Sequence, residues 1–197
     1  MNQETELTFD VRREAEERAR ELIRCGFQEQ DEIAESLVEE FEDQGLEEED
    51  AEEIVAPLWR ERLAEQASWP ETTDVDRLEE AFDTLEDQGI VAAMDFTCCA
   101  NCGYHEIGGE AEADSRGFVF FHQQDTESAA AGHGLMLRYG GFRAEGEPKE
   151  SAERRTVEIG REVVAALEAA GLPVEWDGSP AKAIAVTPLT WLNRLPE

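Results

Sequence analysis

The chain has 197 residues, a formal net charge of −31, and a hydrophobic share of 41%. An apolar share of this size can form a buried core, which excludes wholesale disorder. The negative charge repels phosphate backbones and anionic lipids, so direct binding to nucleic acid or to a membrane surface is not expected.

The negative charge is concentrated in the first half of the chain, because residues 1–100 carry 32 acidic and 8 basic side chains. Such runs usually form solvated helix faces, and an acidic mimic of DNA that occupies a basic protein is the alternative. No apolar run approaches the roughly 20 residues of a membrane span, and the N-terminal sequence lacks the pattern of a secretory signal. We therefore expect a cytoplasmic protein.

Three consecutive segments near the N-terminus have apolar residues at spacings of three and four, which is typical of amphipathic helices. The helices are expected to begin near Phe9, at a cap formed by Asp31, and near Glu48. Glycines at positions 26 and 45 end the first two. Residues 1–67 are therefore predicted to form an acidic helical bundle.

Residues 68–197 are predicted to form an α/β domain, because strand-like runs alternate with helical segments there. Strands are expected at Ile90–Phe96, Phe118–Phe121, Leu135–Tyr139, Val174–Trp176 and Ala183–Val186. A helix is expected near His105–Ala113, because Gly103 weakens an earlier start. The last two are predicted to form a hairpin at the sheet edge. The predicted fold class is α/β, with α+β as the variant: an N-terminal helical bundle packed with a sandwich around a mixed sheet of about five strands.

One stretch, Ile90–Ile107, joins the most strand-like apolar run to three of the four cysteines. Cys98 and Cys99 follow its strand, and His122 and Asp125 follow the next predicted strand. If the two strands are parallel, both groups lie at the carboxyl edge of the sheet, where open α/β sheets bind ligands.

The cysteine spacing favours a metal site. Cys99 and Cys102 form one Cys-x-x-Cys, with Cys98 in front and His105 three residues behind. Such thiolates bind one zinc ion at about 2.3 Å, and a tetrahedral site needs two further ligands. Cys98 or His105 would be the third, and His122 or His133 the fourth. The predicted metal ligands are Cys99, Cys102, His105 and His122, with plain loop cysteines or a reactive or redox thiol pair as alternatives.

The same edge also favours a second hypothesis, an enzyme in which Cys98 or Cys99 is a nucleophile or redox thiol beside His122 and Asp125. A purely structural interpretation is that Asp125 caps the helix that follows and His122 donates to a loop carbonyl. No flanking signature selects a particular reaction.

The chain resembles a known family over most of Phe9–Leu192. The segments that carry the resemblance are FQEQDEI (Phe27–Ile33), SWPETTDVDRLEEAF (Ser68–Phe82), QGIVA (Gln88–Ala92), FVFFHQQDTESA (Phe118–Ala129), GLMLRYG (Gly134–Gly140) and VEWDG (Val174–Gly178). They resemble a bacterial family known only as a domain of unknown function. That family has no assigned activity, substrate or cofactor, so the resemblance implies a shared architecture and little else. The leading hypothesis is a non-enzymatic protein-binding module with a small zinc or thiol site at Cys98–Cys102.

Overall fold

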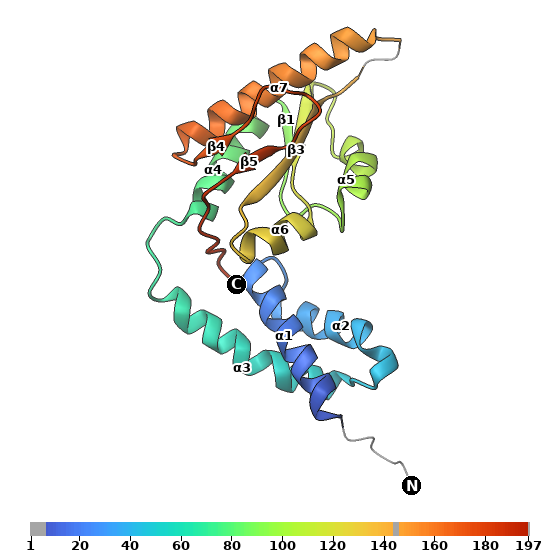
Figure 1. The fold of residues 1–197 in the computed structure, drawn as a ribbon, viewed down its shortest axis with the longest axis vertical. Helices are drawn as coiled ribbons and strands as arrows, with labels where there is room; N and C mark the ends of the chain where they lie inside the picture. Colours follow the sequence, from blue (N-terminus) through green and yellow to red (C-terminus); the bar gives the residue numbers. More distant parts are fainter. Residues whose placement is uncertain (1–6, 144–145, 197) are drawn as a thin grey trace. The chain divides into compact units, whose positions relative to one another are not determined.

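The computed structural model describes residues 7–143 and 146–196, and the chain divides into two compact units (Figure 1). The first unit comprises Met1–Glu71 and Leu192–Glu197, and the second comprises Thr72–Trp191. Within the described ranges, no helix is long and apolar enough to cross a membrane.

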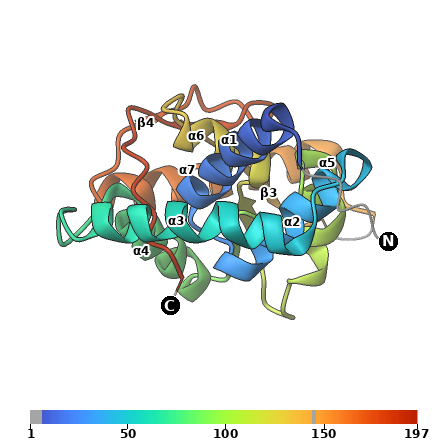
Figure 2. The same ribbon diagram turned by 90° about the horizontal axis from the view of Figure 1, so that it is seen from below.

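The first unit is a packed set of three helices, as predicted. They are α1 (Phe9–Cys25), α2 (Gln30–Glu40) and α3 (Glu48–Gln66), and a 3-10 turn, η1 (Glu42–Gln44), joins the last two. Helix α3 packs against both α1 and α2 (Figure 1 and Figure 2). Their apolar stripes form one core, which includes Ala15, Ala19, Ile23, Ile33, Leu37, Ile54, Val55 and Leu58.

The C-terminal segment completes this unit. Leu195 is buried in the same core. The side-chain amide of Asn193 donates to the carbonyl oxygens of Cys25 and Gly26, at 2.9 and 3.1 Å. These two bonds satisfy carbonyl groups that the end of α1 would otherwise leave without partners.

The ends of the helices follow capping rules, with one correction. Gly26 ends α1 in the left-handed conformation, with φ of 76°, as predicted. Helix α2 begins earlier than expected, because its cap is Glu29 and not Asp31. The backbone N–H of Glu29 donates to the carboxylate of Glu32 at 2.8 Å. Asp31 instead lies in the first turn, where the helix dipole favours a negative charge.

The second unit is an α/β fold around a five-stranded sheet. Its helices are α4 (Asp74–Asp87), α5 (Ala100–Glu106), α6 (Gln123–Ala130) and α7 (Lys149–Ala169), with a 3-10 turn, η2 (Ile107–Gly109), after α5. Its strands are β1 (Ile90–Ala93), β2 (Gly117–Phe120), β3 (Leu135–Gly141), β4 (Val174–Glu175) and β5 (Ile184–Val186).

The sheet is mixed, as predicted. Its strand order is β1-β2-β3-β5-β4. Strands β1 and β2 are parallel, and the other neighbouring pairs are antiparallel. The predicted hairpin of β4 and β5 is confirmed, with β4 at the sheet edge.

Helices cover the two faces of β2 differently. Successive side chains of a strand point to opposite faces, so Phe118 and Phe120 share one face and Phe121 lies on the other. Phe121 makes an edge contact with Phe82 of α4, whereas Phe118 and Phe120 both contact Tyr104 of α5. Helix α5 therefore lies on the face opposite α4 (Figure 1).

The short helix α5 begins five residues before the position that the sequence predicts. Gly103, which was expected to oppose an early start, lies inside the helix and is buried. A Cβ atom at this position would overlap the ring of Phe120. Glycine is therefore required for close packing of α5 on β2, and this contact outweighs its poor helix propensity.

Candidate metal centre

The two sequence segments that carry the candidate side chains leave the sheet at the same edge. Strands β1 and β2 are parallel, with Ala93 opposite Phe120. Beyond the strands, the N–H of Phe96 donates to the carbonyl of Phe121 at 2.8 Å, and that of Gln123 donates to Thr97 at 3.1 Å. The parallel pairing on which the sequence argument depended is confirmed.

Residues 94–99 form a constrained loop between β1 and α5. Asp95 and Thr97 have φ of 50° and 60°, a left-handed conformation that is uncommon for residues other than glycine. The hydroxyl of Thr126 on α6 donates to the carboxylate of Asp95, and the hydroxyl of Thr97 donates to the carbonyl of Cys99 at 3.2 Å. These bonds hold the loop that presents Cys98 and Cys99.

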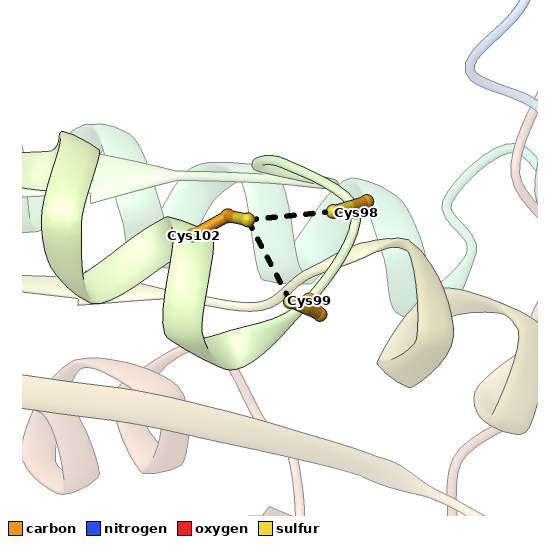
Figure 3. Close-up of side chains that lie close together, drawn as sticks. All are labelled: Cys98, Cys99 and Cys102. Carbon is orange, nitrogen blue, oxygen red and sulfur yellow. Dashed lines mark hydrogen bonds between the residues drawn. The ribbon is translucent and has the colours of Figure 1, made fainter.

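Three cysteine sulfurs converge where this loop enters α5 (Figure 3). The Sγ of Cys102 lies 3.6 Å from that of Cys98 and 3.7 Å from that of Cys99. All three sulfurs lie within 4.8 Å of one another, and this is the one metal-sized group of His, Cys, Asp or Glu in the described chain. A tetrahedral ion with bonds of about 2.3 Å would separate its sulfur ligands by about 3.8 Å. The two distances from Cys102 therefore match the sulfur–sulfur spacing of a tetrahedral zinc site.

The pKa values of Cys99 and Cys102 are shifted in opposite directions. The pKa of Cys99 is lowered, chiefly because the backbone N–H of Cys102 donates to its sulfur, and hydrogen bonding with the thiols of Cys102 and Cys98 lowers it further. The pKa of Cys102 is raised to about 11, because its thiol is hydrogen-bonded to Cys98 and Cys99. Cys99 is thus the first of the pair to become a thiolate. Cys98 is exposed, so solutes can reach the cluster.

His122 belongs to a buried network at the start of α6. Its Nδ1 accepts from the N–H of Asp125 at 3.3 Å, and its Nε2 lies 2.9 Å from the Asp125 carboxylate. Burial lowers the pKa of His122, which favours a neutral imidazole with its proton on Nε2. Arg138 of β3 donates to the other oxygen of Asp125 at 3.1 Å. Burial raises the pKa of Asp125, and the Arg138 charge opposes that rise.

This network corrects the structural interpretation of the same residues. The cap of α6 is His122, and Asp125 is the third residue of the helix, where its carboxylate accepts from the N–H of His122. Both nitrogens of the imidazole are therefore engaged with Asp125, and the residue is buried, with an exposed fraction of 4%.

The structure brings together three of the predicted site residues and not the others. Cys98, Cys99 and Cys102 form the cluster, whereas His105 and His122 are not among the donor atoms within 4.8 Å of it. The described cluster could therefore offer three sulfur ligands to a metal ion, and neither His105 nor His122 adds a fourth to it.

Sequence reasoning missed two residues that shape this edge, Asp95 and Arg138. Burial raises the pKa of Asp95 to about 6, and the nearby charge of Glu127 adds to the rise. The signal for Asp95 was a single acidic residue inside the apolar run Ile90–Phe96. Arg138 had no comparable signal in the sequence. It lies near Asp125 only because β3 pairs with β2, and that pairing cannot be seen within either segment.

The fold and the cluster define a class of protein: an acidic three-helix unit and a mixed-sheet α/β unit that carries three clustered thiols. The family model described as a domain of unknown function (DUF6891) matches residues 8–195, so the chain belongs to that family. Comparison with curated proteins and with solved structures finds no match. Membership in a family of unknown function confirms the resemblance and assigns no activity.

Proposed function

We propose that the protein is a non-enzymatic binding module that holds one zinc ion at Cys98, Cys99 and Cys102. The observation that carries this proposal is the spacing of the sulfurs, 3.6 and 3.7 Å from Cys102 to its two neighbours. Thiolate ligands favour zinc and other thiophilic ions over magnesium or calcium. Free thiols of this kind suit the reducing cytoplasm, where we place the protein.

The proposed zinc ion has a structural role. It would tie the loop at Cys98 to the first turn of α5, and that loop holds two residues in the left-handed conformation. Binding requires loss of the thiol protons, so affinity rises with pH. The fourth ligand in this proposal is His105, one helical turn after Cys102, or a water molecule.

Cobalt substitution tests the site. The full chain loaded with Co²⁺ should show the thiolate-to-cobalt charge-transfer band and the visible bands of tetrahedral coordination. Cys99→Ser and Cys102→Ser should lose most of the charge-transfer intensity. Cys25→Ser is the matched control, because Cys25 is buried in the core of the first unit and lies outside the cluster. An unchanged spectrum in Cys99→Ser, or no band in the parent chain, contradicts the proposal.

The fourth ligand is tested in the same experiment. If His105 binds the metal, His105→Ala shifts the visible bands and weakens cobalt binding. His133→Ala is the control, since His133 is another exposed histidine of the second unit. Equal spectra for these two variants would assign the fourth position to water.

A thiol-based activity is the second candidate function, and the lowered pKa of Cys99 next to Cys102 favours it. An activated thiol alkylates faster than free cysteine near neutral pH. Mass spectrometry of the metal-free chain after brief alkylation would identify such a residue. If all four cysteines react no faster than free cysteine, this candidate is removed.

A protein partner is also part of the proposal, and an acidic groove of the first unit supports it. The groove has a volume of about 760 Å³ and lies between α2 and α3, with Trp59 among its lining residues. Among the described residues that line it, none is basic and five carry carboxylates: Glu29, Asp31, Glu49, Glu52 and Glu53. A segment rich in lysine or arginine complements this surface.

Binding of a fluorescent oligolysine peptide tests this surface. The affinity should fall as salt rises, and Glu49→Gln with Glu52→Gln should weaken it. The control is Glu79→Gln with Glu80→Gln, an equal charge change on α4 of the second unit. Equal losses of peptide affinity in the two double variants would mean that the peptide responds only to the net charge of the protein.

A further inference from the structure

A second pocket of the first unit lies between α1 and α3 and has basic character. It has a volume of about 170 Å³ and is lined by Arg20, Ile23, Arg24, Leu58, Glu61, Arg62 and Glu65. Three guanidinium groups thus face two carboxylates, which leaves an excess positive charge in a chain whose net charge is −31. This pocket lies in a different unit from the thiol cluster.

The buried member of the pocket is Arg62, whose exposed fraction is 9%. Its guanidinium donates to Glu65 at 3.0 Å and to the carbonyl of Arg24 at 3.5 Å, and it stacks on the ring of Trp69 at 4.4 Å. Its Nε–H has no hydrogen-bond partner among the described residues. Buried donors on charged groups are rarely left unpaired, so this atom points to a missing acceptor.

The other two arginines lie on the exposed side of α1. Arg24 is in the last turn of the helix, and its side chain makes no ion pair in the described part of the chain. Arg20 has one weak ion pair, with Glu16 at 3.7 Å. Both guanidinium groups are therefore available to a ligand in the pocket.

We infer that the pocket between α1 and α3 binds a small oxyanion, a phosphate or a carboxylate group, with Arg20, Arg24 and Arg62 as donors. Guanidinium groups bind such oxygens through paired, charge-assisted hydrogen bonds. A volume of about 170 Å³ holds one small anion with a few waters, since a water occupies about 30 Å³. Glu65 is neutralised by Arg62, whereas Glu61 opposes the anion.

Side-chain NMR of the full chain tests this site through the Nε–H signal of Arg62. Inorganic phosphate and acetate are titrated separately, with sodium chloride added to keep the ionic strength constant. The chemical shift of this signal should change and reach a plateau with one of the two anions. The anion that produces the plateau shows whether the site binds a phosphate or a carboxylate group.

Three variants test whether the affinity for the anion depends on the charges that line the pocket. Arg24→Gln should weaken binding by about tenfold or more, and Glu61→Gln should tighten it, because one removes a donor and the other a repelling charge. Arg13→Gln is the control, since Arg13 pairs with Glu17 elsewhere on α1 and should leave the affinity unchanged. The inference is overturned if neither anion gives a saturable shift of the Arg62 signal. It is also overturned if Arg24→Gln and Arg13→Gln bind the anion with equal affinity. Either result means an adventitious ion only.

Discussion

Replacing Asp95 with asparagine should stabilise the protein near neutral pH. Asp95 lies in the loop before the thiol cluster and accepts a hydrogen bond from Thr126. Burial raises the pKa of its carboxyl from 3.8 to about 6. An asparagine keeps an oxygen for Thr126 and tolerates the left-handed φ of 50° at this position. The substitution therefore removes a partly buried charge and leaves the local structure intact.

The sign and size follow from the two pKa values. Because the folded-state value lies above the unfolded one, the folded protein binds more protons between pH 3.8 and about 6. The contribution of Asp95 to stability is thus fully present below pH 3.8 and is lost as the pH rises to about 6. At 1.36 kcal/mol per unit, the loss is about 3 kcal/mol at most, and partial solvent exposure reduces it.

Urea unfolding of the parent chain and of Asp95→Asn between pH 4.5 and 7.5 measures this effect. The variant should be more stable by about 1–3 kcal/mol at the upper end of the range, with the difference shrinking toward the lower end. Asp83→Asn is the matched control, since Asp83 is exposed on α4 and changes the net charge equally. A difference that does not depend on pH, or a variant less stable at pH 7.5, refutes the reasoning.

Two further substitutions test packing contacts. Gly103→Ala should cost about 1–3 kcal/mol in urea unfolding, because the added Cβ overlaps the ring of Phe120, whereas Gly108→Ala, which meets no atom within 4 Å, should cost far less. Asn193→Ala should cost about 1–3 kcal/mol, because two buried carbonyls at the end of α1 lose their donor; an unchanged unfolding midpoint would show that the C-terminal segment does not stabilise the first unit.

The regular elements were predictable because their signals are local. The spacing of apolar residues in α1 and α3 predicts their buried faces. The apolar run at Ile90 predicts a strand, but β1 lies at the sheet edge and only its first residue, Ile90, is fully buried. The order of strands and helices predicts the mixed sheet and its edge hairpin. The type of each element therefore follows from the pattern within its own segment, and the type of sheet follows from the order of the elements.

Features set by distant contacts were not predictable. The early start of α5 depends on Gly103 meeting Phe120, and the place of the C-terminal segment depends on Asn193 meeting the end of α1. Both contacts join residues far apart in the chain, so no periodic pattern in the sequence indicates them. Local pattern therefore predicts the elements here, and long-range packing decides their limits.

The candidate site also has one part that the sequence predicts and one part that it does not. Spacing brought out Cys98, Cys99 and Cys102, because residues this close along one loop and helix turn must lie near one another. It could not assign His122, since a histidine that follows a strand reads equally as ligand, catalyst or helix cap. The contact with Asp125 shows the imidazole in the capping role.

Zinc content measured together with thiol reactivity tests the central claim most directly. The full chain, purified without chelator, should contain about one zinc ion, and a chelator should release it and expose three additional reactive thiols. Less than about a tenth of an equivalent of zinc, with the three clustered thiols reactive from the start, would contradict the account.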